Sequence, residues 1–286
     1  MSRRNNPERL GAPQPDAPAP PPQTTNTQTD IFSFINPTEF VDLPSKGELY
    51  PEGHPAHGLD SIEIRHMTAK EEDILTSESL IKKGVALDRV IDSLIVNKKI
   101  KASDLLIGDK NALLLAARIT GFGPEYKISV TCPACADQAE QTIDLSQIEN
   151  KDTLSELENV TRLENGNYQL VFPQFENLEI ELKLLYGKDE KAISDKREKR
   201  RKLKQDAALI TDQLKTLIVR VNEHVERASL DQFVDRCPSI ITRKVRKTYE
   251  SLSPDIDLSY DYQCAECGFE QKASLPLTAE FFWPRQ

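Results

Sequence analysis

The stretches Cys132-Pro133-Ala134-Cys135 and Cys264-Ala265-Glu266-Cys267 decide how this chain is organised. Each C-x-x-C motif places two thiolates about one tight turn apart, which supplies half of the tetrahedral shell of a structural zinc ion. The two motifs are separated by 128 residues (264 − 135 − 1), so a shared ion would join two distant parts of the sequence. We therefore predict one structural zinc ion bound by Cys132, Cys135, Cys264 and Cys267.

The residues on both sides of each motif indicate β-strands. Apolar and polar residues alternate over 125–130 and 257–262, which lead into the motifs, and over 142–145 and 268–275, which follow them. A strand, a cysteine knuckle and a second strand are how zinc ribbons present their ligands. Two separate reduced dithiols remain the alternative. A redox role is disfavoured, because neither motif opens a helix whose dipole would lower a thiol pKa.

A set of helices is predicted between the first strands and the first knuckle. Thr68 and Glu71 have the spacing of a capping box, and the helix that they begin is expected to end at Gly84. A second helix is predicted over 88–97, and a third runs from Asp104 or Asp109 to Thr120. These helices would form a small layer.

Further strands and helices are predicted around this layer. Alternation indicates strands at 61–65, 168–172 and 178–184. Residues 188–227 are predicted to form one long helix, charged in its first half and amphipathic in its second, and a last helix follows over 241–252.

The predicted fold class is α+β. An N-terminal helical layer accompanies a small antiparallel β unit with the four-cysteine zinc ribbon, and a long helical insertion lies between the knuckles. The expected divisions are a disordered tail at 1–30, which holds seven of the 18 prolines, a helical layer and β unit with the first knuckle at 31–187, a helical insertion at 188–252, and a β segment at 253–286 that completes the ribbon.

Charge is unevenly distributed along the chain. The net charge of −9 disfavours binding to nucleic acid, yet residues 188–204 carry nine Lys or Arg against four Asp or Glu. We interpret this run as a solvated helix face with ion pairs Asp195–Lys199 and Glu198–Lys202. A nucleic-acid footprint and a site for an acidic protein are the alternatives.

Motifs of catalysis and of membranes are missing from the sequence. It contains no Gly-rich phosphate loop, G-x-S-x-G elbow or H-E-x-x-H motif, and no apolar run long enough for a membrane helix. His54 and His57 could bind a metal, although a polar loop is the better interpretation. Cys237 is expected to be a small buried apolar residue. We predict a protein that is not an enzyme and has no small-molecule substrate.

Several segments occur in an order that is typical of a known family. They are Leu43–Gly47 with Tyr50-Pro51, Met67–Ser77, Lys83-Gly84, Asp104–Asn111, Ala117–Gly123, Tyr126 and the Cys132/Cys135 knuckle. Together they resemble the baseplate hub proteins of contractile-tailed (T-even-type) bacteriophages. The resemblance is dense over about 40–145 and continues at the second knuckle and at 277–283.

The resemblance implies a structural or assembly role in the baseplate hub, exerted through other hub or tail proteins during tail morphogenesis. It implies a location in the host cytoplasm during assembly and in the virion baseplate, and it brings no catalytic residues. Segments 43–51 and 104–123, together with the long helix, would be the contact surfaces. The alternative function is a zinc-ribbon regulator that binds nucleic acid through the basic helix near 196–204.

Overall fold

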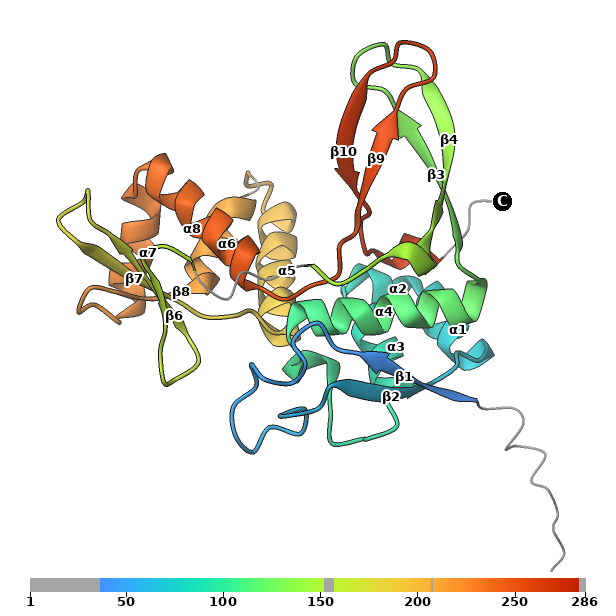
Figure 1. Cartoon of the computed structure of the whole chain (residues 1–286), viewed down its shortest axis with the longest axis horizontal. Helices are drawn as coiled ribbons and strands as arrows, with labels where there is room; N and C mark the ends of the chain where they lie inside the picture. Colours follow the sequence, from blue (N-terminus) through green and yellow to red (C-terminus); the bar gives the residue numbers. More distant parts are fainter. Residues whose placement is uncertain (1–36, 152–156, 207, 283–286) are drawn as a thin grey trace, which may run out of the picture. The chain divides into compact units, whose positions relative to one another are not determined.

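A computed structural model describes residues 37–151, 157–206 and 208–282 (Figure 1). The predicted tail at 1–30 lies outside these residues. Helices and small antiparallel sheets alternate along the chain, which confirms the α+β class. The helices are α1 (Ala69–Thr76), α2 (Glu78–Lys82), α3 (Ala86–Leu94), α4 (Ile107–Phe122), α5 (Gly187–Lys202), α6 (Leu209–Leu217), α7 (Arg227–Arg236) and α8 (Ser239–Leu252), with 3₁₀ turns η3 (Ala102–Asp104), η4 (Leu145–Gln147) and η5 (Ala279–Phe282).

The strands form three hairpins and one larger sheet. Hairpins β1–β2, β3–β4 and β9–β10 are separate two-stranded sheets, and β5, β6, β7 and β8 form a four-stranded antiparallel sheet in that order. Their bounds are β1 (Thr38–Asp42), β2 (Ser61–Arg65), β3 (Glu125–Thr131), β4 (Gln138–Asp144), β5 (Val160–Arg162), β6 (Tyr168–Phe172), β7 (Leu178–Leu182), β8 (Ile218–Val221), β9 (Ser259–Gln263) and β10 (Glu270–Ser274).

Helix α4 is the centre of the larger hydrophobic core. The apolar residues of α4 pack with those of α1, α3 and β2, and the aromatic rings of Phe281 and Phe282 close the core from the C-terminal side. The prediction that segment 104–123 is a contact surface is therefore wrong for most of its residues, because they are buried inside the protein.

The predicted helix from Thr68 to Gly84 is interrupted at Ser77. Ser77 is extended (φ −68°, ψ 102°) and separates α1 from α2. The hydroxyl of Thr76 donates to the carbonyl of Glu72 at 3.0 Å, and such local bonds from Ser and Thr favour helix ends over helix interiors. The predicted start is confirmed: the Glu71 carboxylate accepts from the N–H and the hydroxyl of Thr68 at 2.9 and 2.7 Å.

The single helix predicted over 188–227 is wrong. Helix α5 ends at Lys202, α6 begins at Leu209, and Ile218–Val221 forms strand β8 against β7. Ile218 and Val221 would fit the stripe of a helix, but β-branched residues also suit a strand, and the open side of β7 offers backbone partners. Both side chains are buried in strand β8.

A second core is built from the four-stranded sheet and three helices. Leu170, Ile180 and Leu182 of the sheet pack against Leu214 and Leu217 of α6 and against apolar residues of α7 and α8. The predicted face of the last helix is confirmed, because Ile241, Val245, Thr248 and Leu252 are buried. The division of the chain at 187 and 252 stays a prediction.

A buried carboxylate at the start of α4 holds the segment 43–50. Asp109 accepts hydrogen bonds from the Ser45 N–H at 2.9 Å, the Ser45 hydroxyl at 2.5 Å and the Tyr50 hydroxyl at 2.6 Å. Burial raises the pKa of Asp109, and these donors oppose that rise. No residue pattern in the sequence predicted this network.

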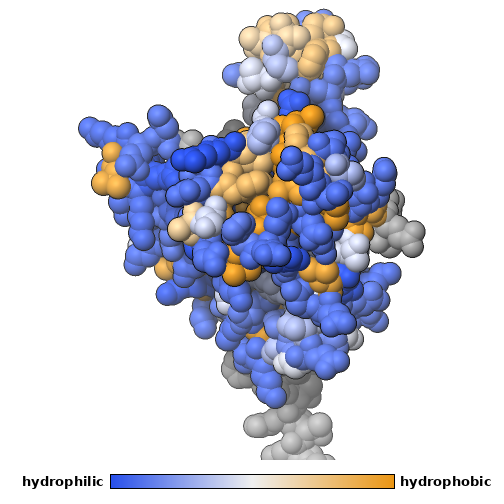
Figure 2. All heavy atoms as spheres, turned by 90° about the vertical axis from the view of Figure 1, so that its left-hand side faces the viewer, coloured by the Kyte–Doolittle hydropathy of each residue, from blue (hydrophilic) through white to orange (hydrophobic). Residues whose placement is uncertain are grey.

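The outer surface is largely hydrophilic on the side drawn in Figure 2, where apolar colour gathers at the upper tip of the molecule and in a central band. The tip in the same position in Figure 1 is formed by hairpins β3–β4 and β9–β10. The turns of these hairpins are the two knuckles, because residues 132–137 join β3 to β4 and residues 264–269 join β9 to β10.

Candidate metal centre

The two cysteine knuckles have the same backbone design. In the first, the Cys132 N–H donates to the Asp137 carbonyl at 2.8 Å, and the Ala136 N–H donates to the Cys132 carbonyl at 2.9 Å. In the second, Cys264 N–H donates to the Phe269 carbonyl at 2.9 Å, and Gly268 N–H donates to the Cys264 carbonyl at 3.0 Å. Both turns place a residue with positive φ after the second cysteine, Ala136 at 61° and Gly268 at 70°.

The four thiol groups converge although the motifs are far apart in sequence. The Sγ atoms of Cys132 and Cys267 are 3.7 Å apart, as are those of Cys135 and Cys264, and all four lie within 4.8 Å of one another. A tetrahedral ion with metal–sulfur bonds of about 2.3 Å requires sulfur atoms about 3.8 Å apart. The thiol positions are therefore compatible with one shared metal ion.

Charge inside the cluster favours a cation. Burial would raise the pKa of Cys132, but the N–H groups of Cys135 and Ala134 outweigh it and lower that pKa to about 6. At Cys135, the Asp137 N–H acts to lower the pKa, yet the neighbouring thiols of Cys267 and Cys132 raise it to about 12. The cluster thus resists full ionisation by itself, and a divalent cation would stabilise the four-thiolate form.

A small apolar shell surrounds one side of the cluster. Cys132 and Cys264 are buried with Tyr262, while Cys135 and Cys267 are exposed. Val130, Tyr260 and Phe269 pack around the buried three. Burial raises the pKa of the Tyr262 hydroxyl, and the neighbouring Cys264 and Cys132 raise it further. This hydroxyl is a donor placed beside sulfur atoms that would carry negative charge.

The donor set indicates the kind of centre. Four cysteine ligands fill a tetrahedral shell and leave no position for water or substrate, which is the arrangement of structural rather than catalytic sites. Within the residues that the structure describes, these cysteines are the one group of three or more His, Cys, Asp or Glu side chains close enough to share an ion.

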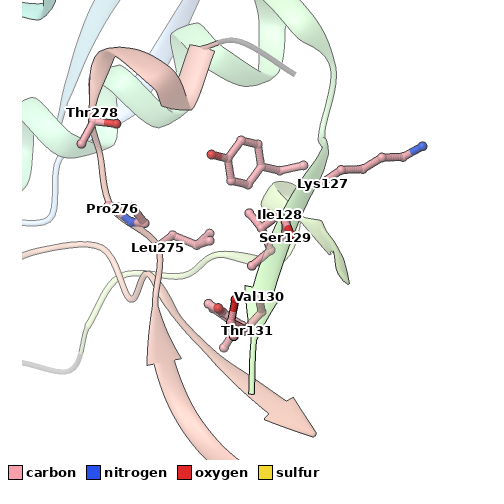
Figure 3. Close-up of a pocket in the computed structure, with 10 residues that line it drawn as sticks. Lys127, Ile128, Ser129, Val130, Thr131, Leu275, Pro276 and Thr278 are labelled. Atoms are coloured by element: carbon pink, nitrogen blue, oxygen red, sulfur yellow. The ribbon is translucent and has the colours of Figure 1, made fainter. Parts of the chain in front are cut away.

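A cleft of about 330 Å³ lies beside the knuckle hairpins (Figure 3). It separates β3, from Tyr126 to Thr131, from the segment Leu275–Thr278 and from Tyr260. In Figure 3 the side chain of Lys127 points away from the opposite wall, and hydroxyl groups supply the remaining polar side-chain atoms of the lining. This lining contains no carboxylate, imidazole or thiol that would suggest catalysis.

The two histidines considered as ligands have structural contacts instead. The ring of His54 stacks on Tyr50 with centroids 4.5 Å apart, and its Nδ1 accepts from the Ala56 N–H at 3.1 Å. His57 Nδ1 lies 2.8 Å from the Tyr50 carbonyl oxygen. Both rings shape the turn after Tyr50.

The remaining predicted features lie apart from the cysteine cluster. Cys237 is half-buried beside the second core, where burial raises the pKa of its thiol.

The basic run lies on the exposed second half of α5, and Glu198 pairs with Lys202 at 2.8 Å as predicted. The predicted pair Asp195–Lys199 is not among the ion pairs between described residues. In the same described part of the chain, no helix is long and apolar enough to cross a membrane.

The protein has an α+β fold in which a four-cysteine cluster, compatible with one metal ion, brings together hairpins from distant parts of the chain. The model of the T4 bacteriophage base plate protein family matches residues 36–283, and the chain belongs to this family. The searches found no significant match among curated proteins or solved structures. Family membership indicates a structural role in the phage tail baseplate, in contact with other tail proteins.

Proposed function

We propose that this protein is a component or assembly factor of the baseplate hub that acts by binding other hub or tail proteins during tail morphogenesis. The observation that carries the proposal is the family match, which spans 36–283 and so includes both cores and both knuckles. The protein would act in the host cytoplasm while tails are assembled and then be part of the virion baseplate. It would have no catalytic activity of its own.

Phage genetics tests this role. A phage with a nonsense codon in this gene, grown in a non-suppressing host, should produce heads without functional tails in electron micrographs. Supplying the wild-type chain from a plasmid should restore tails. Normal tails and normal infectivity without the protein would contradict an essential role in assembly.

We further propose that Cys132, Cys135, Cys264 and Cys267 hold one structural zinc ion. The sulfur geometry and the closed donor set support zinc, for which four-thiolate shells are common. Elemental analysis of the purified full-length protein should find about one zinc per chain. The variant Cys132→Ser should lose the ion. The variant Cys237→Ser should retain it, because Cys237 packs against the core of the four-stranded sheet and not against the cysteine cluster.

A further inference from the structure

A small basic groove lies between the end of α2 and the second half of α5. Its volume is about 210 Å³, and it joins residues that are more than 100 positions apart in the sequence. The lining consists of Ile81, Lys82, Lys83, Gly84, Ser194, Arg197, Glu198 and Arg201.

Positive charge in the groove is only partly neutralised. Lys82 pairs with Glu78 at 2.7 Å, and Glu198 pairs with Lys202 at 2.8 Å, so these four groups are matched. Lys83, Arg197 and Arg201 have no ion pair within the described residues. The two arginines are four positions apart and therefore lie on one face of α5.

Gly84 allows the two elements to come together. Its φ of +64° turns the chain directly after α2, and a Cβ added there would lie only 3.2 Å from the Ser194 hydroxyl of α5. Lys83, the residue before Gly84, lines the groove together with Arg197 and Arg201 of α5. The positive charges of the groove thus come from two elements, the end of α2 and helix α5. In this respect the groove differs from a simple run of basic residues along one helix.

The chemistry of the groove favours an acidic protein segment over nucleic acid. The protein as a whole carries a net charge of −9, which repels a polyanion as long as DNA. The lining has no aromatic side chain on which a base would stack, but it does have the exposed apolar side chain of Ile81. A short peptide segment with carboxylates beside an apolar residue matches both features.

We infer that this groove binds an acidic segment of another protein, with Lys83, Arg197 and Arg201 contacting its carboxylates and Ile81 contacting an apolar side chain. Arginine suits this task because its planar guanidinium forms paired hydrogen bonds to a carboxylate. This binding site would belong to the proposed function, because it gives the chemistry by which one tail-protein partner is bound. Only the statement that the partner is a tail protein rests on the proposed function.

Binding assays with the purified full-length protein test the groove. The probes are a fluorescent peptide of repeated Glu-Glu-Leu, its Gln-Gln-Leu counterpart, and a single-stranded DNA of similar length, all at about 0.1 M salt. We expect only the acidic peptide to bind. The double variant R197E/R201E should weaken that binding at least about tenfold. The matched control R243E/K247E changes net charge equally at exposed positions of α8 and should leave the affinity within about twofold.

Three results would overturn the inference. They are no binding of the acidic peptide, equal loss in both double variants, and tighter binding of DNA than of peptide, the last of which would favour a nucleic-acid partner. Circular dichroism of R197E/R201E checks that the variant is folded. Normal tails in the absence of the gene would contradict the proposed function without altering this measurement, so the two failures are distinguishable.

Discussion

The buried guanidinium of Arg118 donates hydrogen bonds to backbone carbonyl groups of three different segments. It is fully buried in α4 and donates to the carbonyls of Gly123 at 2.8 Å, Phe281 at 3.1 Å and Glu125 at 3.3 Å. It also lies 5.2 Å from the ring centroid of Phe122. The residue thus ties the end of α4 and the start of β3 to the C-terminal 3₁₀ turn.

Arg118→Met should therefore be strongly destabilising. Methionine fills similar space but leaves buried carbonyls without donors, which costs about 2–4 kcal/mol. Urea denaturation followed by circular dichroism should show a lower midpoint. Arg243→Met, at an exposed position of α8, is the control and should leave the midpoint unchanged. Equal midpoints for the wild type and Arg118→Met would contradict the role given to this residue.

The buried carboxylate of Glu71 should make stability depend on acid pH. Burial acts to raise its pKa, but hydrogen bonds from Ser93, Thr68 and Arg65 prevail and lower it from 4.5 to about 2. A lowered folded-state pKa stabilises the protein above the unfolded value, and this contribution is lost as pH falls from about 4.5 toward 2. It amounts to about 3 kcal/mol at neutral pH.

Comparison of the wild type with Glu71→Gln between pH 7 and pH 2.5 tests this expectation. The wild type should exceed the variant in urea midpoint at pH 7, and the difference should shrink below pH 4.5. A difference that stays constant over this range would show that the Glu71 charge does not contribute. Glu72→Gln, at an exposed neighbour, should show no such trend.

Among elements, helix α4 depends on a close backbone approach that only glycine permits. A Cβ added at Gly108 would lie 1.9 Å from the Pro254 carbonyl oxygen and 2.7 Å from the Asp255 Cα, both in the backbone. At Gly121 of the same helix, the nearest atom would be the flexible Cε of Met67 at 2.8 Å.

Gly108→Ala should consequently destabilise the protein, whereas Gly121→Ala should not. Alanine favours a helix over glycine by about 1 kcal/mol, so Gly121→Ala should be near neutral or slightly stabilising. Gly108→Ala must displace backbone and should lower the thermal midpoint by several degrees. A midpoint for Gly108→Ala equal to that of the wild type would show that the segment at 254–255 moves away without cost.

Local patterns predicted most elements and failed where tertiary pairing decides. Strand β2 and helix α8 matched their periodicity because each has one clearly apolar face. Strand β8 did not, since Ile218 and Val221 satisfy either period and the choice depends on β7, distant in sequence. The cysteine cluster was predictable from ligand spacing. The network of Ser45, Tyr50 and Asp109 was not, because its members share no local pattern.

For the molecule as a whole, the cysteine cluster is a small apolar group beside the two larger cores, and Tyr260 packs against both this group and the larger core. Its apolar shell consists of Cys132, Tyr262 and Cys264 with three partly buried neighbours, and it forms a cluster of its own. The larger cores have many more buried residues. Each knuckle hairpin is a two-stranded sheet, which is only marginally stable alone.

Removal of the proposed zinc ion should therefore loosen the knuckle hairpins and leave the two cores folded. After treatment with a strong chelator, hydrogen exchange measured by mass spectrometry should accelerate in β3–β4 and β9–β10, with little change in α4 and α8. Cys264→Ser should reproduce this pattern without chelator, and Cys237→Ser should not. Uniform acceleration over the whole chain would show that the cores depend on the cluster.

The distance between the knuckles also imposes an order on how the protein is made. The ribosome adds 128 residues between Cys135 and Cys264, which takes about 6 to 26 seconds at 5–20 residues per second. During that time the first knuckle presents only half of a coordination shell. The cluster can close only after synthesis has passed Cys267, so a prematurely terminated product would carry an open pair of thiols. A chain that ends before Cys264 could therefore not complete the site proposed for zinc.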